Sequence, residues 1–160
     1  MSLAILTPQG RVHAQEQIDA AQIVFRRSKS RCHHSNLKDK APIDCVITED
    51  GCVVGVAEIK SRPNMTLAQL QNEFKNEWLI SASKVDALKL GSIMLNVPGY
   101  GILYLKQENL CLMLKITDES GAVCCDYYRK ETVTQATCNG GEALRVNAFI
   151  NMSKAKVYRK

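Results

Sequence analysis

Apolar residues recur at helical spacing near the start of the chain. Between residues 14 and 27, a stripe is formed by Ile18, Ala21, Val24 and Phe25, while polar side chains lie mostly on the other side. Residues three or four positions apart share one face of an α-helix. The pattern therefore predicts an amphipathic helix over this segment.

Two runs rich in β-branched residues follow, at residues 43–47 and 56–60. The segment between them contains Asp50-Gly51. An Asp-Gly pair between such runs is the strongest short-range signal for a β-hairpin. We therefore predict two neighbouring antiparallel strands here.

The register of this hairpin decides which side chains share a face. Because side chains alternate along a strand, Glu58 and Lys60 lie on one face. A two-residue turn would put Asp44 opposite Ala57, and so on the other face from Glu58. A three-residue loop ending in a left-handed glycine would put Asp44 opposite Val56, on the face of Glu58 and Lys60. We expect the three-residue loop, because glycine at the third position suits that conformation.

The rest of the chain alternates between helical and strand patterns. Thr66 is typical of an N-cap, and the apolar stripe behind it predicts a second helix carrying Leu67, Leu70, Phe74, Trp78 and Leu79. A further helix is predicted over residues 81–90, strands over 99–105, 110–116, 123–128 and 143–150, and a loop over 133–141. This order predicts an α/β fold with a sheet, flanking helices and a helical crossover.

Length and composition suit one domain spanning residues 1–160. The sequence contains no internal repeat, linker or low-complexity segment, no apolar run of about 18 residues, and no signal-peptide pattern. Its seven cysteines, among them Cys45, Cys52 and Cys111, indicate reduced thiols rather than disulfides. We expect a cytoplasmic protein with no membrane partner.

Basic residues gather in two segments, and the net charge is +5. Residues 26–34 include Arg27, Lys29 and Arg31, and residues 154–160 form the second segment. Clustered lysine and arginine bind phosphates without reading sequence. A solvated loop or tail would explain the same composition.

The residues Pro42-Ile43-Asp44, a spacer, and then Glu58-Ile59-Lys60 resemble the signature of the PD-(D/E)XK, or restriction-endonuclease-like, nucleases. The family signature has proline directly before the aspartate, whereas one isoleucine intervenes here. The resemblance covers roughly residues 12 to 106. It implies a restriction-endonuclease-like core, with a central mixed β-sheet flanked by helices in the order αβββαβ.

This resemblance implies a Mg²⁺-dependent DNA nuclease, in which Mn²⁺ can substitute. Asp44, Glu58 and the carbonyl of Ile59 would hold the ion, because Mg²⁺ prefers oxygen ligands. Lys60 would lie beside the attacking water and offset phosphoryl charge. Glu16, at the margin of the first helix's apolar arc, corresponds to a family glutamate that completes the metal site. An exposed helical acid is the alternative for Glu16, and a solvated, ion-paired sheet face is the alternative for the others.

DNA would be bound by basic and amide side chains around this site. Arg62 directly follows the signature, Gln71 lies on the next predicted helix, and Lys84 lies on the one after it. The cluster with Arg27, Lys29 and Arg31 follows the first helix. Surface positions are the alternative for each of these residues.

Other constellations fit the chain less well. A zinc site built on Cys32-His33-His34 with Cys124 or Cys125 lacks any CxxC pair, and no phosphate-loop or dinucleotide-binding motif occurs.

A catalytically silent nucleic-acid-binding or assembly protein with the same fold stays open. By analogy the nuclease would be structure-selective, as in Holliday-junction resolvases, or a phage or mobile-element endonuclease, acting in a bacterial or phage-infected cell and forming a homodimer.

Overall fold

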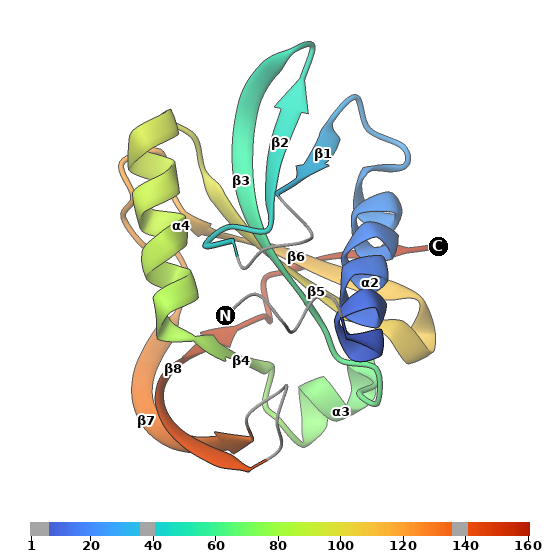
Figure 1. The fold of residues 1–160 in the computed structure, drawn as a ribbon, viewed down its shortest axis with the longest axis vertical. Coiled ribbons are helices and arrows are strands. Elements are labelled where there is room, and N and C mark those ends of the chain that lie inside the picture. Colours follow the sequence, from blue (N-terminus) through green and yellow to red (C-terminus); the bar gives the residue numbers. More distant parts are fainter. Residues whose placement is uncertain (1–6, 36–40, 136–140) are drawn as a thin grey trace.

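A six-stranded mixed sheet forms the middle of the molecule in the computed structural model, which describes residues 7–35, 41–135 and 141–160 (Figure 1). The strand order is β1-β2-β3-β5-β6-β9. Its strands are β1 (Arg31–His34), β2 (Cys45–Glu49), β3 (Cys52–Ser61), β5 (Gly99–Leu105), β6 (Leu110–Thr117) and β9 (Lys156–Arg159). Neighbouring strands are antiparallel except β3 and β5, which run parallel. The predicted strands at 99–105 and 110–116 are confirmed.

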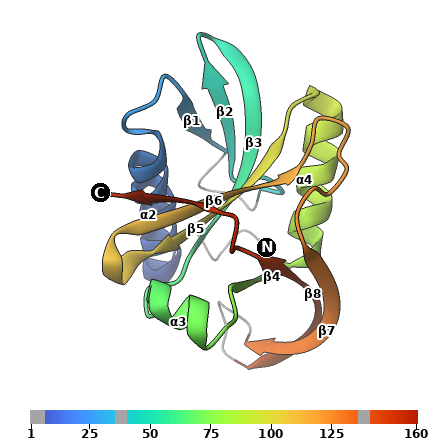
Figure 2. The same ribbon diagram turned by 180° about the vertical axis from the view of Figure 1, so that it is seen from behind.

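Two long helices cover opposite faces of this sheet (Figures 1 and 2). Helix α2 (Pro8–Phe25) confirms the predicted first helix, but it begins earlier, because the Thr7 side chain accepts a hydrogen bond from the Gly10 amide and proline occupies the first turn. Helix α4 (Ala82–Leu95) confirms the predicted crossover helix and packs on the other face. The sheet therefore separates two apolar cores.

Alternate residues of β3 belong to the two cores. Ala57 and Ile59 face the α2 side, together with apolar residues of that helix. Val56 faces the α4 side, where the larger core also takes in Trp78 and Ile80. By the same alternation, Glu58 and Lys60 point to the α4 side.

A second, three-stranded sheet packs near α4 and was not predicted from the sequence. It contains β4 (Glu77–Ser81), β8 (Glu142–Asn151) and β7 (Tyr127–Gln135), in the order β4-β8-β7. In Figure 1 its two long strands curl around the lower end of α4. The predicted strand at 143–150 is thereby confirmed. The prediction of a strand at 123–128 is mostly wrong, because β7 begins only at Tyr127, and the predicted loop at 133–141 is wrong up to Gln135, with 136–140 outside the described residues.

The predicted second helix is correct at its start and wrong at its end. Helix α3 (Leu67–Asn72) has a full capping box built on Thr66 and Gln69. It stops at Asn72, because Lys75 and Asn76 adopt positive φ angles of 51° and 63°. Trp78 and Leu79 therefore lie on strand β4, and Phe74 is left exposed.

The hairpin of β2 and β3 has neither of the two predicted registers. Asp50 and Gly51 form a two-residue turn with φ angles of 50° and 80°, so the expected three-residue loop is wrong. A bulge then inserts one extra residue, Val54, because Thr48 pairs with Val53 while Ile47 pairs with Gly55. The pairing beyond the bulge is shifted by one residue relative to the simple two-residue register.

The described architecture is a mixed α/β fold with a central mixed sheet flanked by helices, as the sequence predicted. A short 3-10 helix, η1 (Lys106–Glu108), joins β5 to β6. In the described part of the chain, no helix has both the length and the apolar character needed to span a bilayer. The assignment of residues 1–160 to one domain stays a prediction.

Candidate active site

Asp44 and Glu58 face each other across the hairpin. Cys45 pairs with Ala57, so Asp44, which directly precedes β2, lies opposite Glu58 on the α4 side of the sheet. The Asp44 Oδ2 accepts a hydrogen bond from the Ile59 amide at 2.8 Å. This bond fixes the Asp44 carboxylate just before the first residue of β2, where β3 runs on beside β5 only.

A lysine ammonium lies between the two carboxylates. The Nζ of Lys84, from the first turn of α4, is 2.9 Å from Glu58 Oε2 and 3.6 Å from Asp44 Oδ1. It also donates to the carbonyls of Ala41 and Pro42, at 3.3 and 3.5 Å. The Glu58 side chain is only 2% exposed and that of Asp44 12%. One cation therefore compensates two nearly buried acids.

Burial and like charge perturb the titration of these groups. Desolvation, together with the neighbouring Asp44 carboxylate, raises the pKa of Glu58 to about 8 against the opposing effect of Lys84. Burial alone would lower the pKa of Lys84, but the Glu58 and Asp44 charges outweigh it and raise that pKa. A carboxyl whose pKa is raised to near physiological pH, and which faces a second acid, is typical of functional sites. Structural ion pairs perturb pKa values in the same way.

Lys60 lies two residues beyond Glu58 on the same face of β3, next to Leu103 of β5. Its side chain is partly buried, and within the described residues it makes no hydrogen bond or ion pair. The ammonium of Lys60 is therefore not committed to a structural partner, unlike that of Lys84.

The oxygen donors at this place come from two carboxylates and the backbone of Ile59. Glu58 Oε2 is buried, and no hydrogen bond of good geometry reaches it from the described residues, despite the Lys84 ammonium at 2.9 Å. The Ile59 amide points toward Asp44, just before the first residue of β2. The amide and carbonyl of one strand residue face the same neighbouring strand, so we expect the Ile59 carbonyl to point to this edge too. Carboxylate and carbonyl oxygens are the ligands that Mg²⁺ prefers. A group of three or more His, Cys, Asp or Glu ligands does not occur among the described residues.

Glu16 does not join this site, which corrects the prediction that it completes the metal centre. It lies on α2, which covers the other face of the sheet, and its carboxylate oxygens lie 3.0 Å from Lys106 Nζ and 3.4 Å from His13 Nδ1. The helical pattern correctly predicted that Glu16 lies near the apolar arc, since it is buried. Which face of the sheet that arc covers is a tertiary property.

The candidate DNA-contacting residues are dispersed. Arg62 follows β3 and donates to the Leu79 carbonyl at 2.9 Å, and burial lowers its pKa. Gln71 is exposed on α3, whereas Lys84 belongs to the acid pair itself. The sequence offered Lys84 only as a groove contact, because nothing local indicates that α4 begins beside Glu58.

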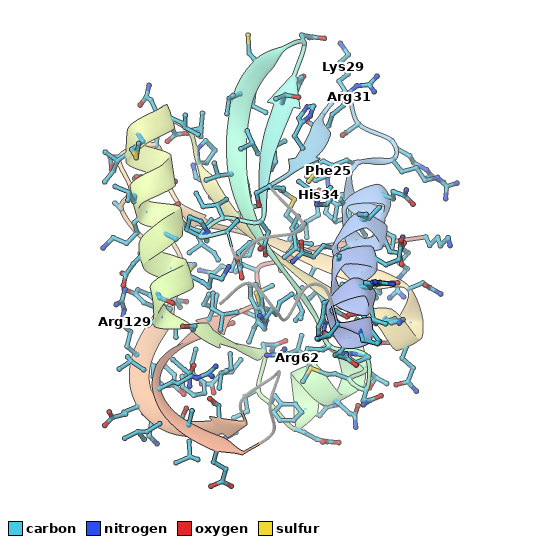
Figure 3. The ribbon with its side chains drawn as sticks, viewed as in Figure 1. Phe25, Lys29, Arg31, His34, Arg62 and Arg129 are labelled. Atoms are coloured by element: carbon cyan, nitrogen blue, oxygen red, sulfur yellow. The ribbon has the colours of Figure 1, made fainter. Side chains whose placement is uncertain are left out.

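The basic cluster lies away from the acid pair. Arg27 follows α2, and Figure 3 shows Lys29 and Arg31 around β1, far from Arg62. Arg31 pairs with Thr48, toward the hairpin turn, whereas Asp44 lies at the other end of β2. The structure therefore does not bring Arg27, Lys29 and Arg31 together with Glu58.

Comparison with known proteins gave no match: no family model, curated protein or solved structure is significantly similar to this chain.

Proposed function

We propose that this protein is a metal-dependent DNA nuclease with a restriction-endonuclease-like core. The observation that carries the proposal is the pair of facing carboxylates, Asp44 and Glu58, with the uncommitted Lys60 two residues further along the same face. The order of elements supports it: helix α2, the meander β1-β2-β3, a helical crossover, and β5 parallel to β3.

In this proposal, Asp44, Glu58 and the Ile59 carbonyl hold Mg²⁺, or Mn²⁺ in its place. The bound ion supplies Lewis-acid polarisation of the phosphodiester and lowers the pKa of water at the site. The hydrogen bond from the Ile59 amide fixes the orientation of Asp44, and the packing around Glu58 holds its side chain facing Asp44. Preorganised ligands of this kind need little rearrangement before reaction.

The two lysines have different roles. Lys60, which lacks a partner among the described residues, positions the attacking water and offsets the charge that develops on the phosphoryl oxygens. Lys84 offsets one of the two negative charges of Asp44 and Glu58 while no metal is bound, because two buried like charges are otherwise costly. With a divalent cation held by Asp44 and Glu58, the Lys84 ammonium would be available for the substrate phosphate.

The substrate class is DNA, and the net charge of +5 favours a polyanion. By analogy with compact nucleases, the substrate is a branched duplex, as for a Holliday-junction resolvase, or the DNA of a phage or mobile element. A homodimer would pair two sites across such a substrate. We place the protein in the cytoplasm of a bacterial or phage-infected cell.

A catalytically silent nucleic-acid-binding or assembly protein is the second candidate, and the Lys84 contacts favour it. An ammonium 2.9 Å from Glu58 and 3.6 Å from Asp44 could compensate the acids permanently, without any metal. In that case Lys84, Asp44 and Glu58 would form a buried ionic cluster with a structural role only. Binding of nucleic acid would then be independent of divalent cations.

Cleavage of a mixed panel of linear duplex, single-stranded and branched DNA tests the proposal. The wild-type protein is compared in Mg²⁺, Mn²⁺ and EDTA with Lys60→Ala and Asp44→Ala, and Lys115→Ala on the exposed side of β6 is the matched lysine control. We expect cutting that needs metal, survives Lys115→Ala and is lost in the two site variants. Cutting that survives both site variants, or no cutting of any substrate, would remove the catalytic proposal.

A further inference from the structure

A pocket of about 520 Å³ opens beside Arg62, one strand repeat beyond Lys60. It is lined by Arg62, Met65, Leu70, Glu73, Phe74, Lys75, Glu77, Trp78, Leu79 and Phe149. Figure 3 shows Arg62 between α3 and β4, and the segment from Leu70 to Leu79, which joins these two elements, supplies most of this lining. The volume falls within the range of small-molecule sites, roughly 300–1,000 Å³. We call it the Trp78 pocket.

Three aromatic residues contribute to the lining of the Trp78 pocket. The Trp78 ring is 2% exposed and packs into the core, and its indole N–H is buried with no hydrogen-bond acceptor among the described residues. The Phe149 ring stacks on the Tyr128 ring, with 4.9 Å between the ring centroids and an interplanar angle of 5°. Phe74 is 46% exposed at the rim, although phenylalanine is normally buried. The Phe74 and Phe149 rings, which belong to the lining outside the core, offer apolar faces that suit a flat, polar-edged ring.

The charges around the Trp78 pocket favour a neutral ring over a phosphate. Arg62 already donates to the Leu79 carbonyl at 2.9 Å, and the lining contains one lysine, Lys75, against two acidic residues, Glu73 and Glu77. Glu77 accepts a hydrogen bond from the Tyr128 hydroxyl, which fixes one acidic group near the rim. A phosphate would meet like charge here, whereas the amino group of a base would meet acceptors.

A second, larger hollow lacks these features. It measures about 810 Å³ and is lined by Pro63, Asn64, Thr66, Gln69, Lys106 and Gln107. No aromatic side chain lines it, so it offers no surface on which a base would stack. The Trp78 pocket is the better site for a base.

We propose that the Trp78 pocket binds an unpaired nucleobase next to the phosphodiester at the Asp44–Glu58 pair. Lys60 and Arg62 are two residues apart in an extended segment, so they lie on one face about 7 Å from each other. This separation suits one nucleotide step between the site and the pocket. A base inside a duplex cannot enter, since it must first be unstacked and turned out. The inference rests on the proposed nuclease function and assigns its substrate class: DNA with an unpaired nucleotide beside the cleaved bond.

Trp78 is the only tryptophan in the chain, so fluorescence excited at wavelengths that tyrosine does not absorb reports on this one lining residue. The experiment uses Lys60→Ala protein in EDTA, titrated with an unlabelled single-stranded oligonucleotide and with the matching duplex. Fluorescence anisotropy of dye-labelled copies of the same strands measures total binding. We expect the single strand, and not the duplex, to quench Trp78 with the same concentration dependence as its binding.

Phe74→Ala tests the stacking contact at an exposed position that should not disturb folding, with Leu90→Ala on α4, 58% exposed, as the matched apolar control. Stacking on one aromatic ring corresponds to roughly a 5- to 100-fold change in affinity. We expect Phe74→Ala to weaken single-strand binding by that factor and to leave duplex binding unchanged, as Leu90→Ala leaves both.

Two results would overturn the inference. The first is single-strand binding by anisotropy with no change in Trp78 fluorescence. The second is equal weakening of single-strand and duplex binding by Phe74→Ala. Because no cleavage is measured, loss of the nuclease proposal would show in the cleavage panel and not here.

Discussion

Glu58 and Glu16 are both buried glutamates with a lysine ammonium about 3 Å away, and they lie on opposite sides of the same sheet. The sequence offered both as metal ligands. Glu58 faces a second carboxylate, that of Asp44, whereas the second neighbour of Glu16 is His13. The difference between the two sites is therefore the charge of the group opposite, not burial or ion pairing.

This comparison shows how a buried acid becomes a candidate ligand. A lysine that pairs with one carboxylate, as Lys106 pairs with Glu16, leaves little net charge for a metal to neutralise. Lys84 faces two carboxylates, so one negative charge stays uncompensated unless a proton or a divalent cation is bound. Two acids sharing one ammonium form a site that a cation would stabilise.

The largest expected effect is on cleavage. Asp44→Asn keeps an acceptor for the Ile59 amide but removes a ligand charge, so we expect DNA cleavage to fall by about 100- to 1,000-fold. Glu16→Gln should change the rate by no more than a few-fold, because α2 lies on the other face. Initial rates with Mg²⁺ measure both. Equal losses would mean that the two glutamate sites are functionally alike.

Replacing the lysine beside each buried glutamate should lower the free energy of unfolding by different amounts at the two sites. Lys84→Met leaves two nearly buried carboxylates without their cation, and we expect a loss of about 3 kcal/mol in the free energy of unfolding in EDTA. Lys106→Met leaves one buried carboxylate, that of Glu16, which keeps His13 at 3.4 Å, so it should cost less than Lys84→Met. Urea unfolding gives both values, and Mg²⁺ should restore stability only to Lys84→Met. Restoration of neither variant would contradict a metal site at the acid pair.

The titration of Glu58 makes the stability of the protein depend on pH. Its pKa is raised from 4.5 to about 8, so the folded protein holds a proton that the unfolded chain has lost. The contribution of Glu58 to the free energy of unfolding therefore falls as pH rises from 4.5 to 8, by at most about 1.4 kcal/mol per pH unit, and is constant above 8. Lys84, with a pKa raised above its usual 10.5, stays charged throughout this window.

Glutamine imitates the protonated form of Glu58, so the stability of Glu58→Gln relative to the wild type should increase between pH 5 and 8. Unfolding midpoints across this range measure the difference. Glu16→Gln should gain no stability, because it removes the charge that Lys106 contacts. A constant difference for Glu58→Gln would argue against a raised pKa.

The parts of the fold that depend on local pattern could be predicted from the sequence. The period of Ile18, Ala21 and Val24 specifies α2, and the runs at 99–105 and 110–116 specify β5 and β6. The shared face of Asp44 and Glu58 was also predicted, although through a different turn. The bulge at Val54, and not a three-residue loop, produces it, and no residue pattern distinguished the two.

The parts that depend on tertiary packing could not be predicted. Trp78 and Leu79 continue an apolar stripe at helical spacing, and only the positive φ angles at Lys75 and Asn76 convert the stripe into strand β4. Asn76, a residue that tolerates that conformation, was the available signal. The position of Lys84 beside Glu58 depends on how α4 crosses the sheet, which no local pattern encodes.

Binding of Mn²⁺ to the metal-free protein tests the central claim most directly, because it does not depend on the choice of DNA substrate. Isothermal titration calorimetry at pH 8 would compare the wild type with Glu58→Gln and Glu16→Gln. We predict one site in the wild type and in Glu16→Gln, and loss of that site in Glu58→Gln. Absence of binding to the wild type, or equal binding to all three proteins, would contradict a cation site at the Asp44–Glu58 pair.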